Sequence, residues 1–308
     1  MVLLFYSEED DPVAWKAALE ARLPDLEVRV WPRIGDPREI EAALVWRPPP
    51  GMLAELPNLR AIFSLGAGID ALLADLTLPE LPLCRMVDPS LTRSMSEYAL
   101  TLALFYHRRL DLYEERQRAA RWRMEMPRPA AETTVGIMGL GELGGDAART
   151  LAAHGFRVRG WSRSRKRIAG VESCAGGKEF DRFLDGLDIV ICLLPLTPET
   201  ENILDAGLFA RLAPGACLVH LARGAHLVEQ DLLDAVQRGR LRGAVIDVFR
   251  EEPLPPDHPF WRHPRIRVTP HTASYSLPET GAEVVADNIR RLRDGRPLRH
   301  LVRRERGY

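Results

Sequence analysis

The 308-residue chain has little of what marks several large classes of protein. Its four cysteines, at positions 84, 174, 192 and 217, are far apart and form no C-x-x-C pair. This argues against a disulfide framework or a zinc site and favours free thiols in a reducing compartment. The formal net charge is −1, so no overall basic surface for nucleic acid is expected. No apolar run approaches the roughly 20 residues that span a bilayer.

The N-terminus predicts a first strand and no secretion signal. Its apolar segment, 2–6, is too short for a signal-peptide core, lacks a basic start and is followed by four acidic residues at 8–11. The composition therefore favours a soluble cytoplasmic protein without a metal, and without nucleic-acid or membrane partners. At this length the chain has room for two domains with separate cores.

Apolar and amphipathic segments alternate along the chain, which predicts an α/β fold with mostly parallel sheets covered on both faces. Strands are expected at 2–6, 27–31, 43–46, 61–65, 83–86, 134–138, 156–161, 189–193, 217–221, 243–248 and 266–269. Helices or turns are expected at 12–22, 37–44, 69–73, 94–121, 146–153 and 282–293. A proline-containing stretch at 126–129 is the clearest linker by composition.

The sequence GLGELG at 139–144 lies between a predicted strand and a predicted helix. In this context G-x-G-x-x-G indicates a dinucleotide site. Gly139 makes the tight turn, Gly141 lets the backbone approach the pyrophosphate, and Gly144 lets helix and strand pack closely. The first N–H groups of the helix then face the pyrophosphate.

The end of the next strand indicates which dinucleotide binds. NAD sites usually place an acidic residue about 20 positions after the glycines, where it binds the ribose 2′-hydroxyl. This chain has SRSRKR at 162–167, and no acidic residue lies between Asp146 and Glu172. Arginine can hold a 2′-phosphate by paired charged hydrogen bonds, so we expect NADP(H); the alternative is a solvated basic turn. The candidate ligands are Arg163 first, then Ser162, Ser164, Arg165 and Lys166.

Three polar residues follow later strands: Arg223, Glu252 and His271. A histidine beside a carboxylate has a raised pKa and can donate a proton to a carbonyl oxygen. An arginine can polarise that oxygen and bind an α-carboxylate. The set suits ketone reduction with a nicotinamide as hydride donor. Each residue alone could equally be an ordinary surface or capping residue.

The motifs, taken in order, resemble the D-isomer-specific 2-hydroxyacid dehydrogenase family. They are GLGELG at 139–144, LPLTPET at 194–200, LARG at 221–224, DVF at 247–249 with EPLP at 252–255, and TPH at 269–271. Further segments, such as SLGAGID at 64–70 and WSRSRK at 161–166, are similar to its glyoxylate/hydroxypyruvate reductase A branch.

The resemblance implies a role for each matching residue. His271 is expected to be the acid–base, with Glu252 rather than the adjacent Glu251 as its partner, and Arg223 is expected to bind the substrate. The other residues expected at the substrate are Trp46, Leu65, Gly66, Ala67 and Gly68, although Trp46 could instead belong to the core. Those expected at the cofactor, besides the basic turn, are Gly139, Gly141, Glu142, Leu143, Gly144, Leu194, Pro195, Thr200, Leu221, Ala222, Arg223, Asp247 and His271. Asp247 could equally be a structural cap.

The resemblance also implies two Rossmann-like domains, each a doubly wound parallel sheet, with a cleft between them. The substrate-binding domain would comprise 1–98 plus 283–308 and the dinucleotide-binding domain 99–282, in a homodimer. The expected reaction is NADPH-dependent reduction of a small 2-ketoacid, from glyoxylate to glycolate or from hydroxypyruvate to D-glycerate. The alternatives are another dehydrogenase of this family or a nucleotide-sensing binding protein on the same fold.

Overall fold

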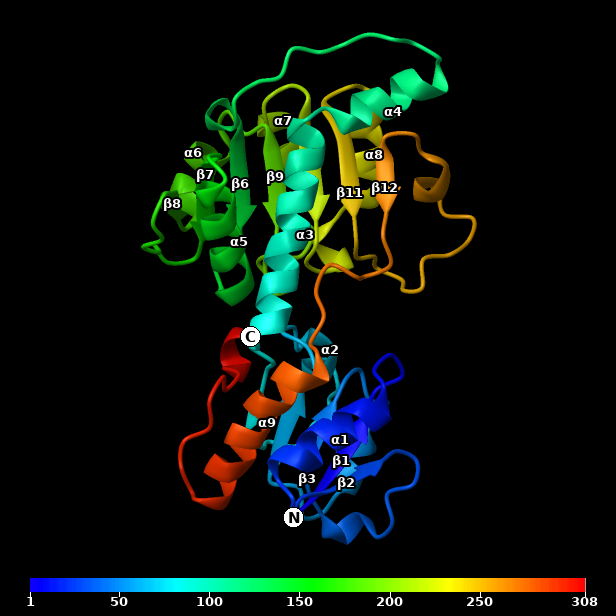
Figure 1. Ribbon diagram of the computed structural model, residues 1–308, viewed down its shortest axis with the longest axis vertical. Helices are drawn as coiled ribbons and strands as arrows, with labels where there is room; N and C mark the ends of the chain where they lie inside the picture. Colours follow the sequence, from blue (N-terminus) through cyan, green and yellow to red (C-terminus); the bar gives the residue numbers. More distant parts are fainter. Residues whose placement is uncertain (308) are drawn as a thin grey trace. The chain divides into compact units, whose positions relative to one another are not determined.

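The computed structural model describes residues 1–307, and the chain divides into two compact units. Unit 1 comprises Met1–Leu91 and the chain from Tyr275 onward, and unit 2 comprises Thr92–Ser274. In each unit the strands pair in parallel in one sheet that packs with helices, as the alternating sequence pattern predicted (Figure 1). No helix among residues 1–307 is long and apolar enough to cross a membrane.

The unit boundaries differ from those that the family resemblance implied. Helix α9 (Pro278–Arg293) belongs to unit 1 from its first turn because Gly281 faces Trp15 of helix α1 (Pro12–Arg22). A Cβ atom on Gly281 would lie 2.5 Å from the Trp15 ring. At the other boundary, Met95 of helix α3 (Pro89–His107) is already buried in a core of unit 2.

Unit 1 has a five-stranded sheet in the order β2-β1-β3-β4-β5. The strands are β1 (Val2–Tyr6), β2 (Glu27–Val30), β3 (Ile40–Val45), β4 (Ala61–Ser64) and β5 (Leu83–Cys84). Helices α1 and α9 pack together, and a short helix, α2 (Asp70–Leu73), follows β4.

The helix or turn predicted over 37–44 is wrong beyond its first residues. Asp36 caps a short 3-10 turn, Pro37–Glu39, by accepting from the N–H of Arg38. The chain then enters β3, which lies between β1 and β4. Ile40 and the residues from Ala42 to Val45 are fully buried, and a continuous apolar run of this kind is typical of a strand covered on both faces.

Unit 2 has a seven-stranded sheet in the order β12-β11-β10-β9-β6-β7-β8. The strands are β6 (Thr134–Met138), β7 (Arg157–Ser162), β8 (Val171–Ala175), β9 (Ile189–Cys192), β10 (Ala216–His220), β11 (Leu241–Ile246) and β12 (Ile266–Val268). The helices besides α3 are α4 (Leu110–Arg118), α5 (Glu142–Ala153), α6 (Phe180–Leu184), α7 (Ala206–Arg211) and α8 (Glu229–Gln237).

Alternate side chains of the unit 2 strands enter two separate cores, one on each face of the sheet. In β9, Ile189 and Ile191 pack with α3 and α5, whereas Val190 and Cys192 pack with α6, α7 and α8. This period of two is what a strand requires when both faces are covered. All four cysteines of the chain are buried free thiols.

The single helix predicted over 94–121 is two helices, α3 and α4. Arg109 between them has a left-handed backbone, with φ of 59°. The chain bends here because α4 is held against the far strands of the sheet. Asp111 pairs with Arg242 of β11 at 2.9 Å, and Glu114 pairs with Arg267 of β12. Figure 1 shows α4 turning away from the end of α3 toward β11 and β12.

Candidate active site

The unit 2 sheet reverses its strand order between β6 and β9. From β6 the chain adds β7 and β8 on one side, and then crosses to β9 and continues outward on the other. Ligands of such sheets bind at the carboxyl edge beside this switch point. The segments predicted for cofactor and chemistry begin at this edge, because β6, β7, β9, β10, β11 and β12 are parallel.

The three motif glycines have three different surroundings. Gly139 has φ of 99°, and a Cβ there would lie 2.5 Å from the Leu193 carbonyl oxygen. A Cβ on Gly144 would lie 1.8 Å from the Gly139 carbonyl oxygen, so only glycine allows α5 to lie this close to β6. A Cβ on Gly141 would meet nothing within 4 Å. The open space at Gly141, directly before Glu142 and Leu143 in the first turn of α5, fits a pyrophosphate.

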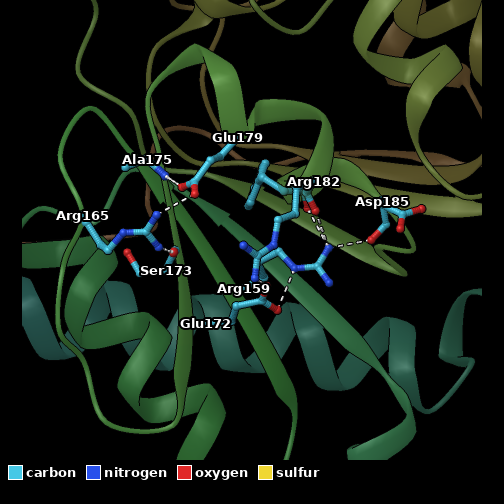
Figure 2. A network of polar contacts seen from close by, with 9 residues as sticks. Arg159, Arg165, Glu172, Ser173, Ala175, Glu179, Arg182 and Asp185 are labelled. Carbon is cyan, nitrogen blue, oxygen red and sulfur yellow. Dashed lines mark hydrogen bonds and ion pairs between the residues drawn. The ribbon is translucent and has the colours of Figure 1, made fainter.

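The basic turn after β7 is partly structural. Arg165 folds back onto β8 and the turn after it, where it donates to the Ser173 carbonyl and pairs with Glu179 at 2.5 Å (Figure 2). Glu179 is itself fixed by the N–H of Ala175 at 2.6 Å. Arg165 therefore has a structural role in this turn, and its part in binding a 2′-phosphate stays a prediction.

A second group of ion pairs lies beside the first. Arg159 of β7 binds Glu172 at 3.0 Å and donates to the carbonyls of Arg182, Phe183 and Asp185 (Figure 2). Arg182 also binds Glu172, at 2.8 Å. These contacts tie β7 to β8 and α6, so the arginine-rich composition here serves the edge of the sheet.

Arg163 is exposed, and its charge acts on Glu199 in another predicted cofactor segment. The pKa of Glu199 is lowered, first by a hydrogen bond from Thr197 and to a smaller extent by the charge of Arg163. Ser162 is buried, and its hydroxyl donates to the Ser164 carbonyl at 2.8 Å, which shapes the turn. Lys166 is exposed, with its backbone N–H bound to the Ser173 hydroxyl.

The 194–200 segment after β9 is closed by its own side chains. The Thr200 hydroxyl donates to the Pro195 carbonyl at 2.8 Å and accepts from the N–H of Thr197 at 2.9 Å. Thr200 thus shapes this loop. Leu194 is buried at its start.

His271 and Glu252 are in direct contact. Nδ1 of His271 lies 2.9 Å from Oε2 of Glu252, and the other carboxylate oxygen accepts from the N–H of Phe249 at 2.9 Å. The His271 backbone is left-handed, with φ of 52°, which a histidine rarely adopts. This conformation is held by its N–H, which donates to the Asp247 carbonyl at 2.8 Å.

The Asp247 carboxylate holds the loop that carries His271. It is fully buried and accepts from the Thr269 hydroxyl at 2.6 Å and from the N–H groups of Thr272 and Ala273, both at 3.0 Å. Of the two roles that the sequence left open for Asp247, these contacts show the structural one.

Arg223 is joined to the histidine pair through a close backbone contact. A Cβ on Gly224 would lie 1.9 Å from the Phe249 carbonyl carbon, so the turn after β10 packs directly on the segment that binds Glu252. The half-buried Arg223 guanidinium donates to the Ala222 carbonyl at 2.7 Å. Leu221 and Ala222, just before it, are buried.

Two histidines that sequence reasoning missed flank Arg223. Nε2 of His220 lies 2.8 Å from the Arg223 carbonyl oxygen, and the Arg223 N–H donates to Nδ1 of His226 at 3.2 Å. Both imidazoles are fully buried. The sequence signal was present as H-L-A-R-G-A-H, with one histidine three positions before the arginine and one three positions after it.

The substrate residues predicted in unit 1 lie after β3 and β4. Trp46 is half-buried, and its ring lies so close to Gly66 that a Cβ on Gly66 would be 2.3 Å from it. Leu65 is buried, and the following residues to Gly68 are partly exposed. The Gly66 N–H is 3.2 Å from the Ser64 hydroxyl, whereas its carbonyl accepts from Met86.

Comparison with known proteins finds similar chains over essentially the whole length. Residues 100–273 match the family model described as D-isomer specific 2-hydroxyacid dehydrogenase, NAD binding domain. The glyoxylate/hydroxypyruvate reductase A of Serratia proteamaculans is 48% identical over 301 residues, which are 96% of each chain. That of Yersinia enterocolitica is 43% identical over the full length of both chains.

Solved structures give the same result. A D-isomer specific 2-hydroxyacid dehydrogenase from Xanthobacter autotrophicus Py2, in complex with NADPH and MES, superposes with a TM-score of 0.96 at 43% identity, covering 100% of this chain and 99% of the other. An NADPH-dependent glyoxylate/hydroxypyruvate reductase from Sinorhizobium meliloti, in complex with NADP and sulfate, has a TM-score of 0.94 at 39% identity with the same coverage.

Proposed function

Because the chain belongs to the D-isomer specific 2-hydroxyacid dehydrogenase family, we propose that it reduces glyoxylate and hydroxypyruvate with NADPH. The observation that carries the proposal is the His271–Glu252 contact at the carboxyl edge of a sheet whose Gly141 leaves space for a pyrophosphate. The products are glycolate and D-glycerate.

His271 supplies the proton. Its Nδ1–H donates to the Glu252 carboxylate, which fixes the orientation of the ring. The proton for the substrate is therefore the one on Nε2, which passes to the carbonyl oxygen as that oxygen gains charge. When bound, NADPH supplies the hydride that the ketone carbon receives. Glu252, itself held by the N–H of Phe249, keeps the ring in place while this proton is transferred.

Arg223 binds the substrate carboxylate and polarises its ketone. A guanidinium offers several N–H donors in one plane, which suits a 2-ketoacid with its adjacent carboxylate and carbonyl. In unit 1, we propose that the backbone of the segment from Leu65 to Gly68 takes part in substrate binding, as the family resemblance implies. Trp46 shields this segment because its ring covers Gly66.

The preference for NADPH rests on Arg163 at the end of β7. No acidic residue takes the position that would repel a 2′-phosphate, and Arg165 is held by Glu179. Arg163 directly follows β7, where NAD sites carry the acidic residue, so we assign it as the principal ligand of the phosphate, with Lys166 contributing positive charge nearby. Glu142 and Leu143 present the first N–H groups of α5 to the pyrophosphate.

We further propose that the protein is a cytoplasmic homodimer. The four buried free thiols support a reducing compartment. The segment between α4 and β6 carries Trp122, Met124 and Met126, which are 104%, 73% and 79% exposed, and a second copy would cover them. We expect Trp122→Glu to lower the sedimentation coefficient to that of a monomer, whereas Trp261→Glu, at another exposed tryptophan of unit 2, leaves it unchanged. Equal coefficients for both variants would contradict this interface.

The acid–base assignment is tested by replacing the histidine. His271→Ala is expected to lower kcat by about 10² or more, with little change in the dissociation constant of NADPH. The matched control is His154→Ala, at an exposed histidine at the end of α5 in the same unit. Wild-type turnover in His271→Ala would refute the assignment, and NADPH binding without ketoacid turnover in the wild type would favour a nucleotide sensor.

A further inference from the structure

Three buried side chains meet at the carboxyl ends of two central strands. His220 of β10 is the register partner of Cys192 of β9, and His226 follows in the next turn. One ligand-type atom from each of the three lies within 4.8 Å of the other two. The reaction described above uses none of them, so their burial at the functional edge needs a separate explanation.

Hydrogen-bond geometry assigns the proton of each ring. Nε2 of His220 faces the Arg223 carbonyl at 2.8 Å, so this nitrogen carries the hydrogen. Nδ1 of His226 accepts from the Arg223 N–H, and its Nε2 lies 3.2 Å from the Pro195 carbonyl, so Nε2 carries the hydrogen there. Each ring is thus a neutral tautomer. Both nitrogens of His226 and Nε2 of His220 are directed at backbone groups, whereas Nδ1 of His220 has no hydrogen-bond partner in the part of the chain that the structure describes. Burial lowers the pKa of His220 to about 3, and His226 contributes to this, so the ring stays neutral at physiological pH.

We propose that His220 and His226 are positioning residues that hold the Arg223 backbone from both sides and join it to the cofactor loop at Pro195. This rests on the proposed role of Arg223 in binding the ketoacid. His220 fixes the carbonyl of Arg223, and His226 fixes its N–H. His226 alone also reaches Pro195, whose carbonyl accepts from Thr200 as well. The two histidines therefore have separable effects, His220 on substrate and His226 on substrate and cofactor.

A metal site is the competing explanation of the cluster. Nδ1 of His220 is buried and has no hydrogen-bond partner among residues 1–307, and the Cys192 sulfur is near. A metal would, however, need a nitrogen of His226, and both of its nitrogens already contact backbone groups. It would also need the Cys192 thiolate, although burial raises the pKa of that thiol to about 12. The contacts present favour the positioning role, in which His220 and His226 hold the Arg223 backbone from both sides; we call this arrangement the clamp.

Amide side chains can separate the two contacts of His226. An asparagine amide reaches about as far as Nδ1 of histidine, and a glutamine amide about as far as Nε2. His226→Asn should therefore keep the contact with the Arg223 N–H and lose the contact with the Pro195 carbonyl. His226→Gln should keep the Pro195 contact and lose the Arg223 contact. His220 uses Nε2 to contact the Arg223 carbonyl. His220→Phe should remove this hydrogen bond, and His220→Gln should keep it.

The experiment measures KM for glyoxylate and the dissociation constant of NADPH in these four variants. We expect KM to rise about three- to tenfold in His220→Phe and His226→Gln, and to stay near wild type in His220→Gln and His226→Asn. The NADPH constant should rise about threefold or more in His226→Asn and stay near wild type in the His220 variants, which also shows that they are folded.

Unchanged KM in His220→Phe, or no rescue by His220→Gln, would overturn the clamp. A rise in wild-type KM after removal of metals with EDTA would overturn it in favour of a metal site. If the wild type reduces no 2-ketoacid, the proposed function fails separately, and the NADPH constants still test the clamp. Equal constants in His226→Asn and His226→Gln would then contradict it.

Discussion

The buried His220 gives the protein a specific sensitivity to acid. Its side chain is fully buried, and desolvation together with the neighbouring His226 lowers its pKa from 6.5 to about 3. The folded state therefore binds fewer protons than the unfolded state between pH 3 and pH 6.5. Within this window the free energy of unfolding falls as the pH falls, and above pH 6.5 the contribution of His220 disappears.

The size of the effect follows from this pKa. At pH 5 an unfolded histidine is protonated and the folded His220 is not. The difference of about 1.5 pH units from the unfolded pKa, at about 1.4 kcal/mol per unit, gives about 2 kcal/mol of stability lost between pH 7 and pH 5. His220→Gln keeps a donor for the Arg223 carbonyl but does not titrate, so it should not lose this amount.

The assay is urea unfolding of both proteins at pH 7 and pH 5, followed by far-UV circular dichroism. Other titrating groups occur in both proteins, so their contributions cancel when the two pH differences are compared. We expect wild type to lose about 2 kcal/mol more than His220→Gln over this interval. An equal loss in the two proteins would show that His220 is protonated in the folded state, and the neutral-tautomer argument would fail.

Three further predictions follow from single contacts. Glu252→Gln keeps an acceptor for the N–H of Phe249 but removes the carboxylate beside His271. We expect kcat to fall about 10²-fold or more in steady-state assays. An unchanged kcat would contradict the catalytic role of the His271–Glu252 pair. Gly141→Ala should leave the melting temperature unchanged but weaken NADPH binding in a fluorescence titration. Gly224→Ala should lower the melting temperature, because its methyl group would lie 1.9 Å from the Phe249 backbone. The opposite pattern would refute both assignments. Arg163→Ala should weaken the binding of NADPH about tenfold or more and leave the binding of NADH unchanged. Arg167→Ala is the charge-matched control. Equal losses of affinity for the two cofactors would contradict a 2′-phosphate contact.

Local patterns predicted the sheets because their signals are strong and repeated. The strands of unit 2 are apolar runs bounded by turn residues, and the glycine motif fixed which strand begins the nucleotide unit. The Pro12–Arg22 helix was predicted with its exact bounds because Asp11 caps it and Pro12 begins it. Family resemblance supplied the residue roles, which remain predictions for this chain.

Long-range contacts explain what the sequence could not predict. Nothing local stops the 94–121 helix at Arg109, since the bend comes from ion pairs of α4 with β11 and β12. Strand β8 was missed because its five residues, VESCA, include Glu172 and Ser173 and so form no continuous apolar run, and it is held at the sheet edge partly by arginines of β7 and α6. In the candidate site, Arg165 was expected to assist Arg163, and the sequence could not show that Glu179 lies against it.

The most direct test of the central claim is the oxidation of NADPH by the purified protein with glyoxylate and with hydroxypyruvate, followed by absorbance beside a parallel series with NADH. We predict turnover of both ketoacids, with a higher kcat/KM for NADPH than for NADH. Equal kcat/KM values for the two cofactors would contradict the role of Arg163 but keep the reductase. Tight binding of NADPH with no turnover of either ketoacid would contradict the proposed function itself.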